Sequence, residues 1–424
     1  MEILGILFLI FVVMISIGLH ELGHLTPAKK FGVKVTQYMI GFGPTIWSKK
    51  KGETEYGIKA IPLGGYIRMI GMVPPPKDGK DAKGPFAEIV NTARKQSMDE
   101  IEPGDENKVF YKLSVPKKLT VMIGGPFMNL VLAFLFFTIS FTGIGFPAAT
   151  NQVKQVVACL PSDVDVLGDC LVGTTPSPAL AAGMKADDKI IKFSGKEITN
   201  WEELATAIQK SSEGTVAITV LRNEKEFELE AQIVNAIRPE SANAVTPNKP
   251  APYLGIAPQI IMEKQPVSSV VKTLEEITVG TGQVLWNLPN RVGQLFGAAF
   301  LGEKRDPAGL VGIVGVTRVG GEIAAADIPA MWRVATLLNL AGGLNMALFL
   351  FNLLPLLPLD GGHAAGAIYE GLRRQIARIR RKPDPGPADT SKMLPFAYSV
   401  AILLIGLSIL LLYVDVVNPV RLGG

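Results

Sequence analysis

Three residues near the N-terminus are spaced so that they could hold and use a metal ion. The segment His20-Glu21-Leu22-Gly23-His24 reads H-E-x-x-H. On a helix, histidines four residues apart lie one turn apart on the same face, so both imidazoles can reach one ion. Neutral imidazoles suit Zn²⁺, which lowers the pKa of a bound water to about 7 when one position stays open. Glu21 lies beside that face and can take a proton from the water. The pattern therefore predicts zinc-dependent hydrolysis.

The setting of this motif favours a metal site over a chance match. The motif ends an apolar run from about Ile3 to Leu25, which is long enough to cross a bilayer. A carboxylate inside such a helix costs about 2.5–3.5 kcal/mol, so Glu21 is not expected there without a function or a partner. The chain has 3 histidines, and two of them belong to the motif. The alternative is a helix in which both histidines simply have their hydrogen bonds satisfied.

A third metal ligand is predicted far along the chain, at Asp360. It follows a second apolar run, Val334–Leu357, and precedes two glycines. Basic residues follow both runs, at Lys29 and Lys30 and again from Arg373 onward, which places both ends on the cytoplasmic side. Asp360 then reaches the membrane depth of the two histidines, and tetrahedral zinc needs such a third protein ligand. The alternative is an ordinary turn residue before Gly-Gly.

The composition indicates a polytopic α-helical membrane protein with soluble insertions. The 424 residues are 48% hydrophobic and 19% charged, and the mean hydropathy is +0.30. The net charge of +4 is small and the basic residues lie beside apolar runs, so no nucleic-acid partner is expected. Glu2 precedes the first run, which is unlike a cleaved signal peptide. About four spans are predicted, with both termini outside: Ile3–Leu25, Leu119–Phe146, Val334–Leu357 and Pro395–Val414.

The polar stretch between the first two spans contains a predicted β-hairpin. Two short extended runs within Tyr56–Met69 are joined by Pro-Leu-Gly-Gly, which is a turn signal. The hairpin is expected to lie at the membrane, and the alternative is an ordinary surface ribbon. The segment Pro74–Asn107 is rich in proline and charge, so we expect it to be flexible. In the second span, Asn129 should face protein and not lipid.

A soluble domain is predicted between the second and third spans, on the external side. The phrase Ser177–Met184 precedes a D-x-I-I-type strand, a helix that begins near Asn200, and a hairpin of Thr215–Arg222 and Glu226–Ile233. This succession resembles a bacterial PDZ domain, an α+β fold that binds an extended peptide at a sheet edge. The alternative is another small α+β module. Cys159 and Cys170 allow either a disulfide or two free thiols.

The predicted domain organisation has four parts. They are an N-terminal catalytic membrane part (1–146), the PDZ-like domain (150–260), an interfacial linker region (261–333) and a C-terminal catalytic membrane part (334–424). Within the linker region, Val267 to about Leu301 reads as an amphipathic helix suited to the membrane interface.

Together these motifs resemble the bacterial site-2 proteases, which are intramembrane zinc metalloproteases with PDZ insertions. The matching motifs are H-E-L-G-H at 20–24, G-F-G-P at 41–44, P-L-G-G-Y at 62–66 and N-L-L-P-L-L-P-L-D-G-G-H at 352–363. The single PDZ-like domain and the P-L-L-P-L-D-G motif most resemble the actinobacterial type. One departure is that Pro358 is displaced by one position from the commoner N-x-x-P-x-P-x-L-D-G pattern.

The resemblance implies a function and a set of residue roles. His20, His24 and Asp360 would hold Zn²⁺, and Glu21 would be the catalytic base. Substrate would contact Asn352 and Pro355, and would pair with the hairpin that contains Gly64 and Gly65. The implied substrates are single-pass membrane proteins already shortened by another protease, such as anti-sigma factors or remnant signal peptides. The implied location is the bacterial cell membrane, with its lipid as a further partner.

The sequence is also compatible with a different class of function. A membrane adaptor without enzymatic activity could use the PDZ-like domain to bind protein tails and the metal only for structure. A structural zinc site is normally closed by four protein ligands, and the sequence supplies three. The count therefore favours an enzyme.

Overall fold

The computed structural model describes residues 1–76, 81–161, 170, 174–237, 250–303, 305 and 309–419. The chain forms two compact units. The first comprises Met1–Ile144 and Gln265–Gly424, and the second comprises Gly145–Lys264. The second unit is inserted between the second and third apolar runs.

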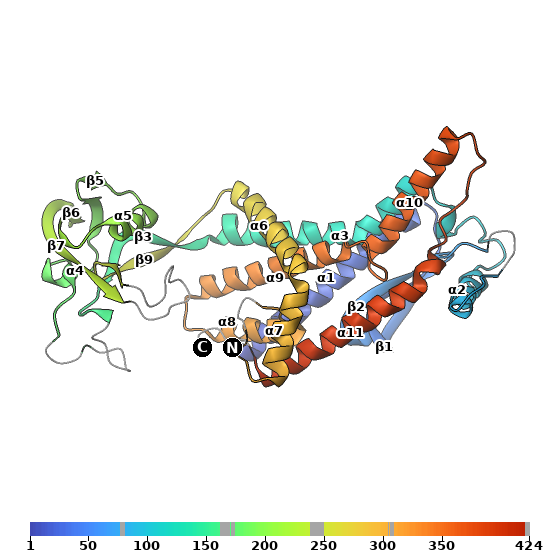
Figure 1. Cartoon of the computed structure of the whole chain (residues 1–424), viewed down its shortest axis with the longest axis horizontal. Helices are drawn as coiled ribbons and strands as arrows, with labels where there is room; N and C mark the ends of the chain where they lie inside the picture. Colours follow the sequence, from blue (N-terminus) through green and yellow to red (C-terminus); the bar gives the residue numbers. More distant parts are fainter. Residues whose placement is uncertain are drawn as a thin grey trace. The chain divides into compact units, whose positions relative to one another are not determined.

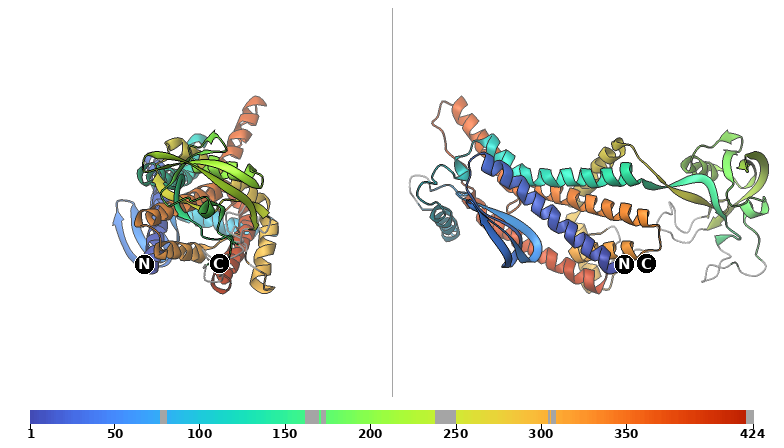
Figure 2. Two further views of the ribbon diagram at one scale, coloured as in Figure 1. Left: turned by 90° about the vertical axis from the view of Figure 1, so that its left-hand side faces the viewer. Right: turned by 180° about the vertical axis from the view of Figure 1, so that it is seen from behind.

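Four helices of the first unit are long and apolar enough to cross a membrane, within the described residues. They are α1 (Glu2–Lys30), α3 (Val115–Thr138) with its continuation to Ile144, α9 (Ala330–Asn352), and α11 (Leu394–Val417) with the turn that precedes it. Helices α1, α3 and α9 lie side by side (Figures 1 and 2). Large apolar side chains such as Phe11, Phe127 and Ile402 are exposed on these helices, as a lipid environment requires. The predicted number of spans agrees.

The third span ends earlier than predicted, at Asn352 instead of Leu357. Pro355 cannot continue a helix because it lacks a backbone N–H, and Pro358 follows within the same turn. A second helix, α10 (Asp360–Ile379), begins at once. It was not predicted as a helix. It packs against α3 and buries small residues, including Ala364 and Ala367.

Four further helices of the first unit refine the predictions. The predicted amphipathic helix is divided into α6 (Val267–Trp286) and α7 (Leu288–Phe300), because Pro289 favours a new first turn. Helix α8 (Ile313–Ala325) occupies a glycine-rich stretch and packs closely on α1. The charged segment expected to be flexible contains α2 (Ala87–Asp99), which buries Val90 on one side. Part of that segment, 77–80, lies outside the described residues.

The predicted hairpin is replaced by a more complex sheet. Strands β1 (Val35–Lys51) and β2 (Thr54–Met69) are each long and bent. The two runs of β2, before and after Pro-Leu-Gly-Gly, do not pair with one another. Residues 37–40 of β1 lie between them and pair with both: Tyr38 is opposite Ile67 on one side and Tyr56 on the other. The prediction of a self-paired hairpin was therefore wrong, because local turn signals do not report a strand inserted from elsewhere.

The second unit is an antiparallel sheet with two helices, an α+β arrangement that the predicted PDZ-like domain and its alternative have in common (Figure 1). Helix α5 (Trp201–Lys210) starts at Asn200, whose side chain accepts a hydrogen bond from the backbone N–H of Glu203. Cys159 and Cys170 form a disulfide. The core contains Ile190, Leu204, Ile218 and Ile233, all fully buried. The order along the sheet is β8 (Pro250–Tyr253), β7 (Lys225–Ile237), β6 (Gly214–Arg222), β4 (Lys189–Phe193), β3 (Phe146–Val156) and β9 (Ile256–Glu263), with β5 (Lys196–Glu197) paired to β4 and α4 (Pro178–Ala181) nearby.

Candidate metal centre

The two histidines of α1 lie together, as their spacing predicts. Their Nε2 atoms are 3.2 Å apart. His24 is 5% exposed and the side chain of His20 is 12% exposed. Both imidazoles therefore point into the helix bundle and not toward the surrounding solvent or lipid.

Asp360 joins them from the first turn of α10. Its Oδ2 is 3.2 Å from Nε2 of His20 and 3.3 Å from Nε2 of His24. The turn that brings it there needs the two glycines that follow. A Cβ on Gly361 would lie 2.2 Å from the carbonyl oxygen of Leu354, and a Cβ on Gly362 would lie 2.5 Å from the backbone nitrogen of Leu357. Asp360, His20 and His24 are the described residues that form a candidate metal-binding group.

The geometry of these three atoms fits zinc. Atoms that surround Zn²⁺ tetrahedrally at about 2.0–2.1 Å lie about 3.3 Å from one another. The three observed separations, 3.2, 3.2 and 3.3 Å, describe one face of such a tetrahedron. Three protein ligands leave the fourth position open, which is the arrangement of catalytic zinc sites.

The hydrogen bonding of His24 also fits a cation bound between these side chains. Its Nδ1 lies 2.7 Å from the carbonyl oxygen of Val121 in α3. A carbonyl can only accept, so Nδ1 carries the proton and the neutral ring presents a lone pair at Nε2. That lone pair faces a carboxylate oxygen of Asp360. Two acceptors at this distance repel unless the ring gains a second proton or a cation lies between them.

Glu21 lies next to the cluster and is held by the β-sheet. It is 8% exposed, and its carboxylate accepts a hydrogen bond from the backbone N–H of Ile67. Gly65, two residues before Ile67, packs closely here, since a Cβ at that position would lie 3.0 Å from Cγ of Glu21 and 2.8 Å from Cγ2 of Ile17. Tyr38 ties the same sheet to α1 by donating to the carbonyl of Gly18 at 2.6 Å. The sheet thus packs directly on the helical turn that carries the motif.

The remaining predicted residues lie in two places. Gly65 contacts Glu21, while Gly64 has a positive φ of 114° and faces Phe42. Asn352 is the last residue of α9, and Pro355 is exposed in the turn before α10. Asn352 therefore ends the helix before the connection to Asp360, and Pro355 lies within that connection.

Sequence reasoning missed the part played by α3. Val121 accepts from one histidine, and Asn129 hydrogen-bonds the other, with its Nδ2 3.1 Å from Nδ1 of His20. Asn129 was predicted to face protein, and it is 1% exposed. The signal that could have revealed its partner is the repeat of four residues from Val121 through Gly125 to Asn129, which matches the spacing of the histidines.

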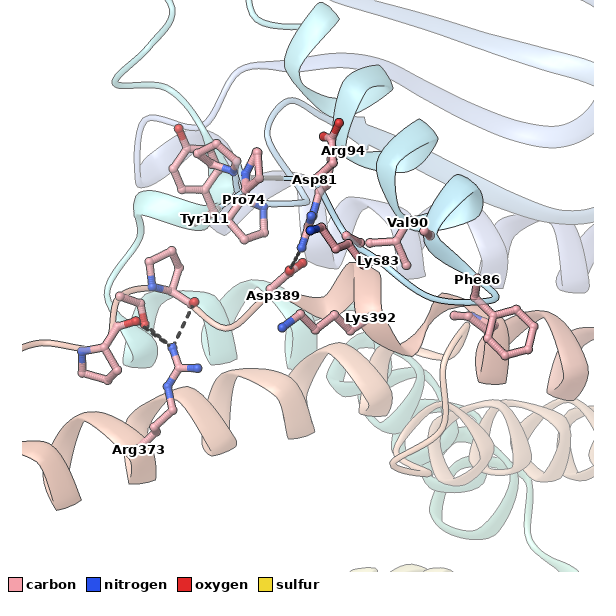
Figure 3. A pocket seen from close by; sticks show the side chains of 18 of the residues that line it. Pro74, Asp81, Lys83, Phe86, Val90, Arg94, Tyr111, Arg373, Asp389 and Lys392 are labelled. Atoms are coloured by element: carbon pink, nitrogen blue, oxygen red, sulfur yellow. Dashed lines mark hydrogen bonds and ion pairs between the residues drawn. The ribbon is translucent and has the colours of Figure 1, made fainter. Parts of the chain in front are cut away.

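A separate cavity of about 890 Å³ lies away from these residues. It is walled by the proline-rich segments around Pro74 and Pro385, by α2 and by α10 (Figure 3). Arg94 forms an ion pair with Asp389 across it, and Arg373 donates to backbone carbonyls at its edge. None of the predicted site residues lines this cavity.

Comparison with known proteins identifies the family. The profile described as peptidase family M50 matches residues 8–383. The chain belongs to peptidase family M50. The zinc metalloprotease Rip1 of Mycobacterium tuberculosis strain H37Rv is 32% identical over 443 residues, covering 100% of this chain and 99% of that protein. Rip1 of Mycolicibacterium smegmatis is 32% identical over 436 residues, covering 99% and 98%. The metalloprotease MmpA of Caulobacter vibrioides is 26% identical over 385 residues, covering 87% of each chain.

These matches confirm the predicted family and class. The M50 peptidases are the site-2 protease family, and the mycobacterial relatives agree with the predicted actinobacterial type. The chain is a zinc metalloprotease of the intramembrane kind, and a multi-pass membrane protein. The alternative of a non-enzymatic adaptor is set aside by this assignment.

Proposed function

We propose that His20, His24 and Asp360 hold the catalytic zinc, and that Glu21 is the base of a protease acting on transmembrane segments. The observation that carries the proposal is the triangle of three ligand atoms at 3.2–3.3 Å with a buried carboxylate beside it. The chemistry that zinc supplies in such a site is polarisation of the scissile carbonyl and a lower pKa for the attacking water. Glu21 takes the proton from that water and returns it to the leaving amine.

The sheet offers a way to open a helical substrate. A peptide bond within a membrane helix is protected, because its backbone groups are already bonded inside the helix. The segment from Gly64 to Met69 pairs with β1 along one edge, and no other described strand pairs with its far edge. An unwound substrate can add there as a strand, beside Glu21. Asn352, at the end of α9, and Pro355, in the turn before Asp360, contact the substrate.

The second unit is assigned a role in substrate selection. Its α+β fold, with a helix beside an antiparallel sheet, supports a PDZ-like domain that binds a peptide or a substrate tail. Basic residues after α1 and along α10 support a cytoplasmic position for the active-site end, with this unit and both termini outside. The substrates are single-pass proteins already trimmed by another protease, with anti-sigma factors and remnant signal peptides as the implied classes.

Two substitutions test the residue roles. Glu21→Gln removes the base and no ligand, so it should keep stoichiometric zinc and lose cleavage of a model transmembrane substrate by about 10²-fold or more. Asp360→Ala removes a ligand from a distant helix, so it should lower both zinc content and activity. Metal analysis and single-substrate cleavage are measured on the same purified samples. Normal turnover by zinc-loaded Glu21→Gln, or full zinc in Asp360→Ala, would refute the corresponding assignment.

A further inference from the structure

One face of α3 is matched to the two histidines of α1. Val121, Gly125 and Asn129 are four residues apart, so they form a single line along the helix. Val121 contacts Nδ1 of His24, and Asn129 contacts Nδ1 of His20. Gly125 lies between them and leaves room for the His24 ring. Helix α3 therefore contacts Nδ1 of each histidine, which is the ring nitrogen that does not face Asp360.

The amide of Asn129 is incompletely satisfied in the orientation seen here. Its Nδ2 lies 3.1 Å from Nδ1 of His20, while its Oδ1 is buried without a hydrogen-bond partner. Nitrogen and oxygen of an amide occupy nearly the same space, so the group can be rotated by 180° without a change in packing. The rotated amide would present Oδ1 to His20 and make the ring nitrogen a donor.

We infer that Asn129 is a positioning residue of the metal centre: its amide oxygen accepts a hydrogen bond from Nδ1–H of His20. This inference rests on the proposed ligand set. When Nε2 of His20 gives its lone pair to a metal, the neutral ring carries its proton on Nδ1. The proton needs an acceptor, and the 1% exposed side chain of Asn129 is the group within reach.

The pairing has a specific physical consequence for the metal. Hydrogen bonds to the second nitrogen of a ligating histidine fix its tautomer and ring orientation, and their loss typically weakens metal binding by about 10–100-fold. His24 obtains this bond from a backbone carbonyl, which no side-chain substitution can remove. His20 depends on a side chain. Zinc affinity should therefore be sensitive to residue 129 although it contacts no metal.

The test measures zinc affinity of the full chain in detergent, by competition with a chromophoric chelator. Asn129→Leu keeps the branching of the side chain and removes the acceptor, so its zinc affinity should fall by about 10–100-fold. Asn129→Asp keeps an acceptor and, as a carboxylate, cannot donate, so it should bind zinc at least as tightly as the native chain. The matched control is Asn345→Leu: Asn345 is also a fully buried asparagine of a span, but it bonds Ala341 in its own helix. Its zinc affinity should not change.

The outcomes separate this inference from the ligand assignment. Asn129→Leu with native zinc affinity overturns the role of Asn129. If Asn129→Leu does not fold, the zinc affinity of Asn129→Asp is the deciding measurement. A decrease of tenfold or more in Asn129→Asp also overturns the role of Asn129, because the native amide would then be the donor. His20→Ala is measured in parallel. If His20→Ala retains zinc, the ligand set itself is refuted. If His20→Ala loses zinc while Asn129→Leu binds it with native affinity, only the positioning role of Asn129 is refuted.

Discussion

Gly125 of α3 lies against the imidazole of His24, so that a Cβ at residue 125 would come within 2.1 Å of Nε2. That nitrogen is one of the three atoms of the proposed metal site. The backbone of one span thus defines the space for a proposed ligand carried by another. Gly23 and Gly124 allow this approach, since a Cβ on Gly23 would lie 2.2 Å from the carbonyl oxygen of Gly124.

Gly125→Ala should therefore displace His24 and weaken zinc binding. We expect a loss of about tenfold or more in zinc affinity, the size of effect seen when a ligating histidine loses its support. Chelator competition measures it. Gly143→Ala is the matched control, because no atom lies within 4 Å of a Cβ there. Equal zinc affinity of the two variants would contradict the role assigned to Gly125.

Gly65→Val should impair the base without removing the metal. Its side chain would collide with Glu21 and Ile17, whose atoms lie 3.0 and 2.8 Å from the Cβ position. Zinc content should stay stoichiometric while the cleavage rate falls by about 10²-fold, the contribution of one general base. Gly65→Ala should show a smaller loss. A zinc-depleted Gly65→Val would mean that the sheet supports the ligands and not the base.

The second unit should lose stability in acid through Asp188. This side chain is fully buried, and Arg222 binds it with two contacts of 2.7 Å. Burial by itself would raise the pKa of Asp188, but hydrogen bonds from Arg222 and from the Lys185 amide hold the pKa below its ordinary value. The folded state thus binds the proton less readily than the unfolded state. Its stabilising contribution is present above about pH 4 and is lost as the pH falls through the lowered pKa.

Hydrogen exchange of the unit in the full-length protein measures this dependence. Core amides of β6 and β7 should exchange faster between pH 4 and pH 2 after correction for the intrinsic rate. Asp188→Asn removes the ionisable group, so this part of the pH dependence should disappear. Arg222→Met leaves the carboxylate buried without its cation and should lower the free energy of unfolding by about 3 kcal/mol near pH 7. An unchanged pH dependence in Asp188→Asn would exclude Asp188 as the source.

Removal of the second unit should change substrate selection and leave the chemistry intact. The backbone N–H of Gln265 donates to the carbonyl of Phe141 at 2.9 Å, so the chain leaves and rejoins the first unit at neighbouring points. A short Gly-Ser linker can therefore replace residues 145–264. None of the proposed catalytic or ligand residues lies in that range. We expect full zinc content and cleavage of a trimmed substrate at a rate within about tenfold of the native one.

An untrimmed substrate gives the discriminating measurement for this deletion. If the unit excludes bulky external domains, the deleted enzyme should cleave trimmed and untrimmed substrates at similar rates, while the full-length enzyme prefers the trimmed one. A folded, zinc-loaded deletion that still discriminates as sharply as the full-length enzyme would show that the size filter lies elsewhere.

Local sequence was sufficient for features that depend on neighbouring residues. The H-E-x-x-H spacing places His20 and His24 on one helix face, and runs of about 20 apolar residues identify the membrane helices. The helix cap at Asn200 is equally local. Asp360 was also predicted, but from membrane depth and family resemblance, not from contact.

Tertiary structure decided how distant segments meet, because those contacts depend on packing that no local pattern encodes. The insertion of residues 37–40 between the two runs of β2 could not be inferred from the turn signal at Pro62. The same is true of Asn129, which reads as one polar residue in a span until α3 is packed on α1. The three proposed ligand atoms lie 3.2–3.3 Å from one another because glycines let the backbones of α1, α3 and the start of α10 approach closely.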